Sequence, residues 1–225
     1  MTSRATELRL AALVFGALAV VFVAFPQIDL WASGQFFRDG HWLFENGSPR
    51  LFEWLYRGTP RVGQLLLVVL LAGLLLGCLR PLTGLRARRL TFGFLLAAAV
   101  AGPVLLVDVA LKDHWGRARP ASVEAFGGTQ RFTPAFVPTD QCRKNCSFVS
   151  GHVATASFIM AFGWLGAPLI RRRWLMAGLA AGALLAAVRL SAGGHFLSDC
   201  VFAWFASYFG LWATEWAFRR LGWLR

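Results

Sequence analysis

Three short groups of polar residues interrupt an otherwise apolar sequence, and their side chains are of the types that bind and transfer phosphate. They lie at residues 112–120, 150–152 and 189–199. Each group adjoins the end of a long apolar segment, where a charged side chain without a partner would cost several kcal/mol on the order-of-magnitude scale for burial. Their position and composition together indicate a functional site.

Five residues in these groups are suited to bind phosphate. A phosphoryl group carries delocalised charge on three non-bridging oxygens, so its binding requires several fixed cations together with backbone N–H groups. Lys112, Arg119 and Arg189 supply the cations. Ser150 and Gly151 precede the fourth apolar segment, where the free N–H groups and the positive dipole end of a helix favour an anion.

Two histidines are suited to divide the roles of nucleophile and acid. His195 and Asp199 are four residues apart, so in a helix the carboxylate would lie on the same face as the imidazole and accept one ring N–H. The other ring nitrogen would then be free to attack phosphorus. His152 comes from a different segment and is expected to protonate the leaving oxygen.

The order and spacing of these residues resemble the three-part signature of the type-2 phosphatidic acid phosphatase superfamily. The resemblance implies a membrane lipid phosphatase that needs no metal or other cofactor, in which His195 forms a phosphohistidine, Asp199 orients it and His152 is the general acid. It also implies that Lys112, Arg119, Arg189, Ser150 and Gly151 hold the phosphate. The signature is carried by Lys112-x6-Arg119-Pro120, Ser150-Gly151-His152 and Arg189-x5-His195-x3-Asp199.

Several neighbouring positions have roles that the signature leaves open. Val149 stands where the family commonly has proline, and Val188 stands where serine often precedes the arginine; these departures bear on loop rigidity and on one secondary hydrogen bond. Arg117 is compatible with either a substrate contact or an interaction with lipid headgroups, and is not assigned to the site. Asp108, four residues before Lys112, is expected to form an ion pair that positions this lysine.

Three other functions could use some of these residues. A two-metal phosphatase requires a cluster of carboxylates, which the three polar groups lack. A phospholipid transporter or receptor would need the cations but not the pairing of His152 with His195 and Asp199, so an enzyme is favoured. A phosphotransferase that passes the phosphoryl group to a second lipid would use the same pocket, and this alternative stays open.

The family's membrane members act on undecaprenyl pyrophosphate, phosphatidylglycerophosphate, phosphatidic acid and the phosphates of lipid A. All of these substrates combine lipid tails with an anionic head. Residues 130–150, which include a pair of cysteines, look most like bacterial lipid A phosphatases and related undecaprenyl pyrophosphatases. The substrate is therefore expected to be an anionic phospholipid, an isoprenoid phosphate or a lipid A phosphate.

The composition predicts that these residues belong to a membrane protein. Of 225 residues, 57% are hydrophobic and 15% are charged, a balance that excludes an ordinary soluble domain. The net charge of +12 is divided among short clusters between apolar segments. It forms no continuous basic face, so anionic lipid is a better partner than nucleic acid. The oligomeric state is left open.

Six apolar segments are predicted to cross the membrane as helices, in a single all-α domain of residues 1–225. An even number of spans puts both termini on the same side. Residues 27–61 are rich in aromatic side chains and are predicted to form short interfacial helices in the headgroup layer. The six segments are residues 10–25, 62–79, 91–107, 153–170, 174–188 and 201–218.

Compact arginine clusters predict the orientation, because such clusters in short loops mark the cytoplasm. Both termini are then cytoplasmic. The three polar groups face the periplasm from the inner membrane of a bacterium. The clusters consist of Arg4 and Arg9, then Arg80, Arg86, Arg88 and Arg89, then residues 171–173, and finally Arg219, Arg220 and Arg225.

Cys142 and Cys146 lie in the predicted periplasmic stretch with only three residues between them. The oxidising compartment and the short spacing predict a disulfide, with two free thiols in a flexible loop as the alternative. No second cysteine or histidine couple lies nearby, which argues against a zinc site. The bond is expected to constrain the loop before Ser150.

Overall fold

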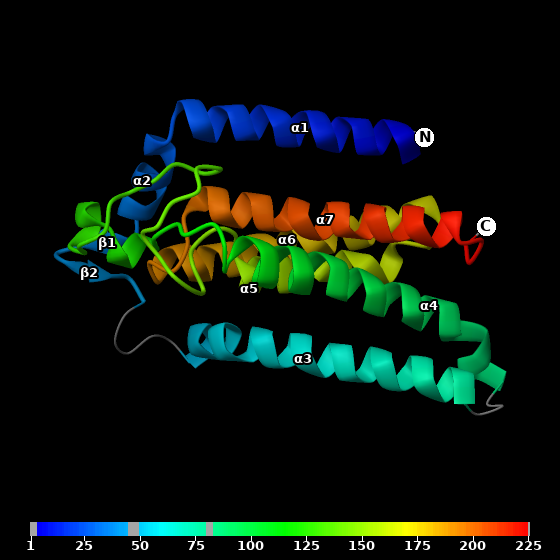
Figure 1. The fold of residues 1–225 in the computed structure, drawn as a ribbon. Coiled ribbons are helices and arrows are strands. Elements are labelled where there is room, and N and C mark those ends of the chain that lie inside the picture. The colour runs from blue at the N-terminus through cyan, green and yellow to red at the C-terminus, as the bar shows by residue number, and fades with distance from the viewer. Residues whose placement is uncertain (1–3, 45–49, 80–82, 225) are drawn as a thin grey trace.

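The computed structural model describes residues 4–44, 50–79 and 83–224, so Arg80 and Arg225 of the arginine clusters lie outside the described residues. The helices run side by side as a bundle, with a small antiparallel hairpin at one end (Figure 1). The elements are α1 (Arg4–Ala24), α2 (Gln27–Gly34), β1 (Phe37–Arg38), β2 (His41–Trp42), α3 (Arg50–Leu79), α4 (Thr83–Ala99), η1 (Val100–Leu111), η2 (Pro120–Ser122), η3 (Glu124–Phe126), α5 (Gly151–Ser157), η4 (Phe158–Gly163), α6 (Pro168–Ser191) and α7 (Leu197–Arg220).

The prediction of an all-α membrane bundle is confirmed, whereas the prediction of six spans is not. Within the described residues, four helices are long and apolar enough to cross a membrane. They contain the second, third and fifth predicted segments and all but the last residue of the first. These helices are Arg4–Ala24, Arg50–Leu79, Gly84–Leu111 and Pro168–Ser191.

The fourth and sixth predicted segments form helices of a different kind. The fourth becomes α5 and η4, a shorter apolar helix of residues Gly151–Gly163. The sixth becomes α7, which has 24 residues but buries polar side chains such as Ser207, Thr214 and Glu215. These side chains hydrogen-bond inside the bundle. Their polarity lowers the mean hydropathy of a helix that neighbouring helices surround.

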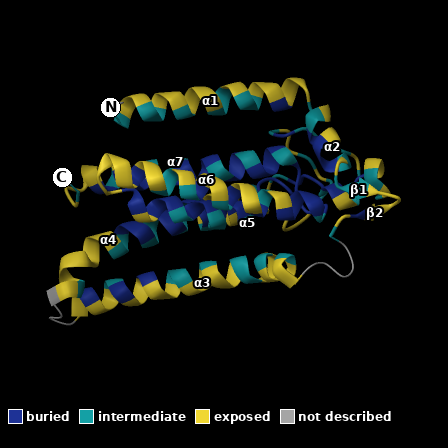
Figure 2. Cartoon of the chain, turned by 180° about the vertical axis from the view of Figure 1, so that it is seen from behind, coloured by how far each residue is buried: buried dark blue, intermediate teal, exposed yellow. Residues whose placement is uncertain are grey.

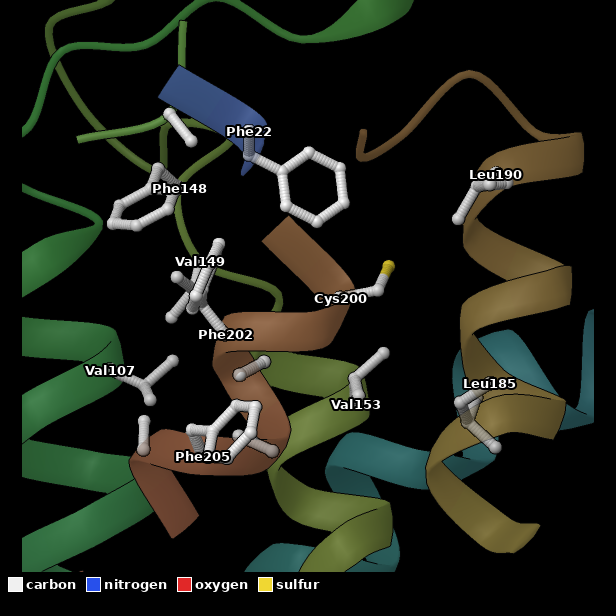
Figure 3. Close-up of a cluster of buried hydrophobic side chains, with 14 of the residues drawn as sticks. Phe22, Val107, Phe148, Val149, Val153, Leu185, Leu190, Cys200, Phe202 and Phe205 are labelled. Carbon is white, nitrogen blue, oxygen red and sulfur yellow. The ribbon is translucent and has the colours of Figure 1, made fainter. Parts of the chain in front are cut away.

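The bundle's core lies around α7, between α5, α6 and η1. Burial is concentrated on these elements, whereas α1 and α3 are largely exposed (Figure 2). Phe202 and Phe205 of α7 pack in one buried cluster with Val107, Val153 and Leu185 (Figure 3). The exposed apolar faces of α1 and α3 are of the kind that lipid covers.

One end of the bundle carries α2, the hairpin and the irregular segment from residue 112 to residue 150, while the described ends of the chain lie at the other (Figure 1). The predicted interfacial helices are only partly present. α2 is a short helix, but it buries Asp29, Ala32 and Ser33 against the protein. The hairpin follows it, and residue 50 already begins the long helix α3.

Candidate active site

The three polar groups of the sequence meet at this end of the bundle. Lys112, Arg119 and Arg189 all lie within electrostatic range of the His152 imidazole. Arg189 and Arg119 also act on His195. The fold therefore gathers three cations and two imidazoles from η1, the loop after it, α5, α6 and the turn before α7.

His195 is held by the backbone of the loop before α5. The residue is 1% exposed, and its Nδ1 lies 2.7 Å from the carbonyl oxygen of Ser147. A carbonyl only accepts hydrogen bonds, so Nδ1 carries the proton and Nε2 has the free lone pair. Asp199 Oδ2 is near, at 3.8 Å from Nδ1. His195 precedes α7, so the pair does not have the helical arrangement considered from the sequence.

The His195 ring is neutral in this environment. Burial lowers the pKa of the imidazole, Asp199 opposes this effect, and Arg189 and Arg119 add to it, so that the pKa is about 3. Because this pKa lies far below 7, the ring is unprotonated on Nε2 at neutral pH. A neutral imidazole is the form that can act as a nucleophile.

Asp199 is fixed by three donors at the start of α7. The backbone N–H of Phe196 donates to Oδ2 at 2.8 Å, and the Ser147 hydroxyl donates to the same oxygen. Arg117 Nη1 donates to Oδ1 at 2.6 Å. Ser147 thus contacts both the carboxylate, through its hydroxyl, and His195, through its carbonyl.

His152 is oriented by Tyr56 of α3, which does not stand out in the sequence. Its Nε2 lies 2.9 Å from the carbonyl oxygen of Tyr56. The two rings stack with centroids 5.2 Å apart and planes inclined by 3°. In the sequence Tyr56 is one of many aromatic residues between residues 27 and 61, and nothing in the local pattern relates it to a histidine 96 residues away.

Arg189 is buried in a way that leaves it capacity to bind an anion. The residue is 3% exposed, and its guanidinium lies 4.7 Å from the centre of the Tyr56 ring. Among the described residues, Nε has no hydrogen-bond partner. A Cβ on Gly194 would lie 2.2 Å from Nη2, so only glycine leaves room for the guanidinium. An unpaired buried N–H of this kind is costly unless a ligand completes it.

Lys112 has the ion pair that the sequence predicted. Its Nζ lies 3.1 Å from Asp108 Oδ1, four residues earlier. A Cβ on Gly151 would lie 2.8 Å from the same Nζ. The absence of a side chain at Gly151 therefore lets the lysine approach the start of α5.

Arg119 is anchored to the disulfide loop. Its Nη2 donates to the backbone oxygen of Asn145 at 2.8 Å and to the side-chain oxygen at 3.0 Å. Burial lowers the pKa of Arg119, and the nearby charge of Arg189 lowers it further. Two arginines placed close enough to repel each other are suited to share a multiply charged anion.

The predicted disulfide is present and closes this loop. Cys142 and Cys146 are bonded, with Cα atoms 5.6 Å apart. The backbone N–H of Cys146 donates to the carbonyl of Lys112 at 3.1 Å. The loop thus contacts Lys112 directly and Arg119 through Asn145. Val149, at the position where proline was expected, is buried in the core cluster (Figure 3).

Arg117 has a role that the sequence left undecided. It is fully buried, which excludes an interaction with lipid headgroups. Burial opposes its charge, but Asp199 and Asp29 outweigh burial and raise the pKa of Arg117. Its Nη2 donates to Asp29 Oδ2 at 2.8 Å. No sequence pattern could pair residues 88 positions apart.

A cavity of about 340 Å³ opens beside these residues between α3, η1 and α5. Lys112 and His152 line its polar part, and Leu66, Val104 and Phe158 line its apolar part. Such a lining suits a ligand with an anionic head and a hydrocarbon chain. Among the described residues, no group of three or more His, Cys, Asp or Glu side chains could hold a metal ion.

The sequence is similar to a family profile and to several named proteins. The profile of the PAP2 superfamily matches residues 89–223, which include all eight predicted site residues. A lipid A 4'-phosphatase of Francisella tularensis subsp. novicida is 34% identical over 203 residues, which cover 87% of this chain and 88% of that protein. Lipid A 4'-phosphatases of Rhizobium etli and Rhizobium leguminosarum are 36% and 35% identical; each alignment covers 85% of this chain, and 79% and 87% of those proteins respectively. No solved structure matches.

Proposed function

The chain belongs to the PAP2 superfamily and is a membrane lipid phosphatase, and from this membership we propose that it dephosphorylates a lipid A-type glycolipid through a phosphohistidine. The observation that carries the proposal is the meeting of three cations and two imidazoles at one end of the bundle. Phosphoryl transfer that uses no carboxylate-bound metal requires groups of these types.

In the proposed reaction, Nε2 of His195 attacks phosphorus while the bond between phosphorus and the lipid oxygen breaks. His152 gives a proton to that oxygen. Burial and the charge of Arg189 lower the pKa of His152 to about 4 in the structure, and the negative charge of a bound phosphate monoester would raise this pKa and favour the protonated form. Water then attacks the phosphohistidine, with His152 accepting its proton, and inorganic phosphate leaves. Throughout the reaction Nδ1 of His195 keeps its proton, which is hydrogen-bonded to the carbonyl oxygen of Ser147.

The same proposal gives the remaining residues the role of holding the phosphoryl oxygens. Lys112, Arg119 and Arg189 neutralise the charge that is shared by these oxygens in the transition state, and the backbone N–H of Gly151 adds a donor. The Ser150 N–H already donates to the carbonyl of Asp199 at 3.1 Å, so Ser150 would contribute its hydroxyl. Arg189 is central, since its Nε is buried without a partner among the described residues.

A glycolipid substrate is supported by a second cavity, which Arg119 helps to line. Its volume is about 610 Å³, and its lining is polar, with Gln130, Gln141, Arg143 and Lys144. Amide side chains suit sugar hydroxyls, and the two cations suit a further negative charge on the head. The named activity of the Francisella and Rhizobium relatives supports the same substrate.

The proposed function predicts phosphate release that does not depend on divalent metal. Purified protein in detergent micelles should release inorganic phosphate from lipid A, and vanadate should inhibit by occupying the site as a five-coordinate phosphorus analogue. EDTA should leave the rate unchanged. Loss of activity in EDTA that a divalent ion restores would refute the mechanism, and turnover of phosphatidic acid but not lipid A would refute the substrate.

Replacing both Arg143 and Lys144 by serine should raise the KM for lipid A about fivefold, because two cations facing the headgroup are lost. The kcat should stay within a factor of about two, since neither residue contacts the reacting phosphoryl group. The KM for phosphatidic acid, which has no sugar headgroup, should not change. Arg38→Ser, at an exposed position of the hairpin, is the control for loss of positive charge. An equal rise in KM for both lipids would exclude a headgroup site.

We also propose that the site faces the periplasm from the inner membrane, with both termini in the cytoplasm. The arginine clusters support this orientation. In a Cys78→Ser background, a cysteine introduced by Thr129→Cys should react with a membrane-impermeant reagent in intact spheroplasts. A cysteine introduced by Arg88→Cys should react only after the membrane is disrupted. The opposite labelling pattern would show that the site faces the cytoplasm.

A further inference from the structure

A buried charge network joins the first extramembrane helix to the candidate nucleophile. It consists of Asp29 of α2, Arg117, Ser198 and Asp199, and is called the Asp29 network below. Arg117 bridges the two carboxylates, with Nη2 2.8 Å from Asp29 Oδ2 and Nη1 2.6 Å from Asp199 Oδ1. All four residues are fully buried.

Both carboxylate oxygens of Asp29 accept hydrogen bonds from residues of this network. Its Oδ1 accepts the backbone N–H of Ser198 at 2.8 Å, and its Oδ2 accepts both Arg117 and the Ser198 hydroxyl. Ser198 is the residue directly before Asp199, in the first turn of α7. Asp29 is therefore linked to the start of α7 in three ways: directly through the backbone N–H and the hydroxyl of Ser198, and indirectly through the Arg117 guanidinium.

With both carboxylates ionised, the network has one more negative charge than positive charges. Two carboxylates share one guanidinium, and the His195 imidazole lies 3.8 Å from Asp199. Burial raises the pKa of Asp29, and Arg117 opposes this effect. A buried cluster of charged side chains contributes little to the free energy of unfolding compared with apolar residues of the same size. Stability alone therefore does not explain these charged residues.

We propose that Asp29 and Arg117 are positioning residues for the nucleophile, which hold the Asp199 carboxylate in place and keep its negative charge available to His195. The inference rests on the proposed function, since it takes His195 as the group that is phosphorylated. It adds two residues that lie outside the phosphate-binding and proton-transfer groups described above.

The physical reason is that phosphoryl transfer makes the His195 ring positive. As Nε2 forms its bond to phosphorus and Nδ1 keeps its proton, the imidazole gains charge that Asp199 stabilises. Arg117 alone would neutralise Asp199 and remove that stabilisation. Asp29 forms an ion pair with Nη2 of the same guanidinium, whereas Asp199 pairs with Nη1. Arg117 can therefore orient Asp199 without cancelling the negative charge of Asp199.

The decisive variant is Asp29→Asn, which keeps the shape of the side chain and removes its charge. With lipid A as substrate, kcat should fall about tenfold or more, because Arg117 then neutralises Asp199. The KM and the inhibition constant of vanadate should stay within about a factor of two, since the cations that bind phosphate are outside the network. Asp39→Asn, at an exposed turn of the same segment, is the matched control and should behave as wild type.

A second variant separates charge from geometry. Arg117→Lys retains the positive charge but cannot bridge two carboxylates as the planar guanidinium does, so kcat should fall about a hundredfold. Rapid quenching at alkaline pH, where phosphohistidine survives, should show that both variants are phosphorylated more slowly than wild type. Rates are expressed per folded protein, measured by thermal unfolding of the same samples.

Three results would overturn the inference. The first is a kcat for Asp29→Asn within twofold of wild type, once corrected for folded protein. The second is a fall in vanadate affinity that matches the fall in kcat, which would mean that the site as a whole is distorted. The third is normal phosphorylation of Arg117→Lys. A wild-type enzyme that hydrolyses lipid A without any phosphohistidine would instead refute the proposed function on which the inference rests.

Discussion

Replacing His195 by glutamine is expected to lower the turnover of lipid A by about 10,000-fold or more, and to abolish the phosphoenzyme. Glutamine can still contact the Ser147 carbonyl through its amide, but it has no nitrogen lone pair that can attack phosphorus. The measurement is the rate of phosphate release, together with the amount of radioactive phosphate that stays on the protein after an alkaline quench.

The matched control for this variant is His114→Gln. His114 is exposed near the same end of the bundle, and its Nδ1 bonds to the carbonyl of Val109. This variant should turn over lipid A within about a factor of two of wild type, as expected for a surface substitution. If His195→Gln kept near-normal turnover, His195 would not be the nucleophile.

Replacing His152 by glutamine is expected to lower the turnover of lipid A by about 100- to 1,000-fold, the usual contribution of a positioned acid. The loss should depend on the leaving group. A sugar alkoxide needs a proton as it departs, whereas the nitrophenolate of p-nitrophenyl phosphate does not. With that activated ester the formation of the phosphoenzyme should fall by no more than about tenfold.

The experiment compares the two substrates on wild-type and His152→Gln protein in single-turnover mode, so that phosphorylation is separated from hydrolysis of the phosphohistidine. An equal loss with both substrates would contradict the acid role. It would then favour a role for His152 in binding the phosphoryl oxygens, next to Lys112 and Arg189.

The sequence by itself determined the class of the protein and most of the residues of the candidate site. Long apolar segments predict membrane helices because hydrocarbon excludes unpaired backbone groups. The polar residues at their ends stand out against that background. The Asp108–Lys112 ion pair and the Cys142–Cys146 bond were predictable too, since both join residues four positions apart. In a helix this spacing puts the lysine and the aspartate on one face, and in the loop it keeps the two cysteines within bonding reach.

The sequence was less informative about the central elements of the bundle. Residues 153–170 were read as one span, but the structure divides them into α5 and η4 and begins α6 at Pro168. Pro168 favours the first turn of a new helix because it has no N–H to donate. α7 is surrounded by other helices, so it can bury Glu215 and Thr214, and its hydropathy does not report its position.

Only the tertiary structure decided which groups orient the two histidines. The Ser147 carbonyl sets the proton on Nδ1 of His195, the Tyr56 carbonyl and ring hold His152, and Asp29 reaches Asp199 through Arg117. These partners come from segments 48, 96 and 88 residues apart. Every residue has a backbone carbonyl, so a sequence does not show which carbonyl accepts a particular hydrogen bond. It also does not distinguish a buried arginine from an arginine at the membrane surface. Such contacts exist only once packing brings α2, α3 and α7 to the same end of the bundle.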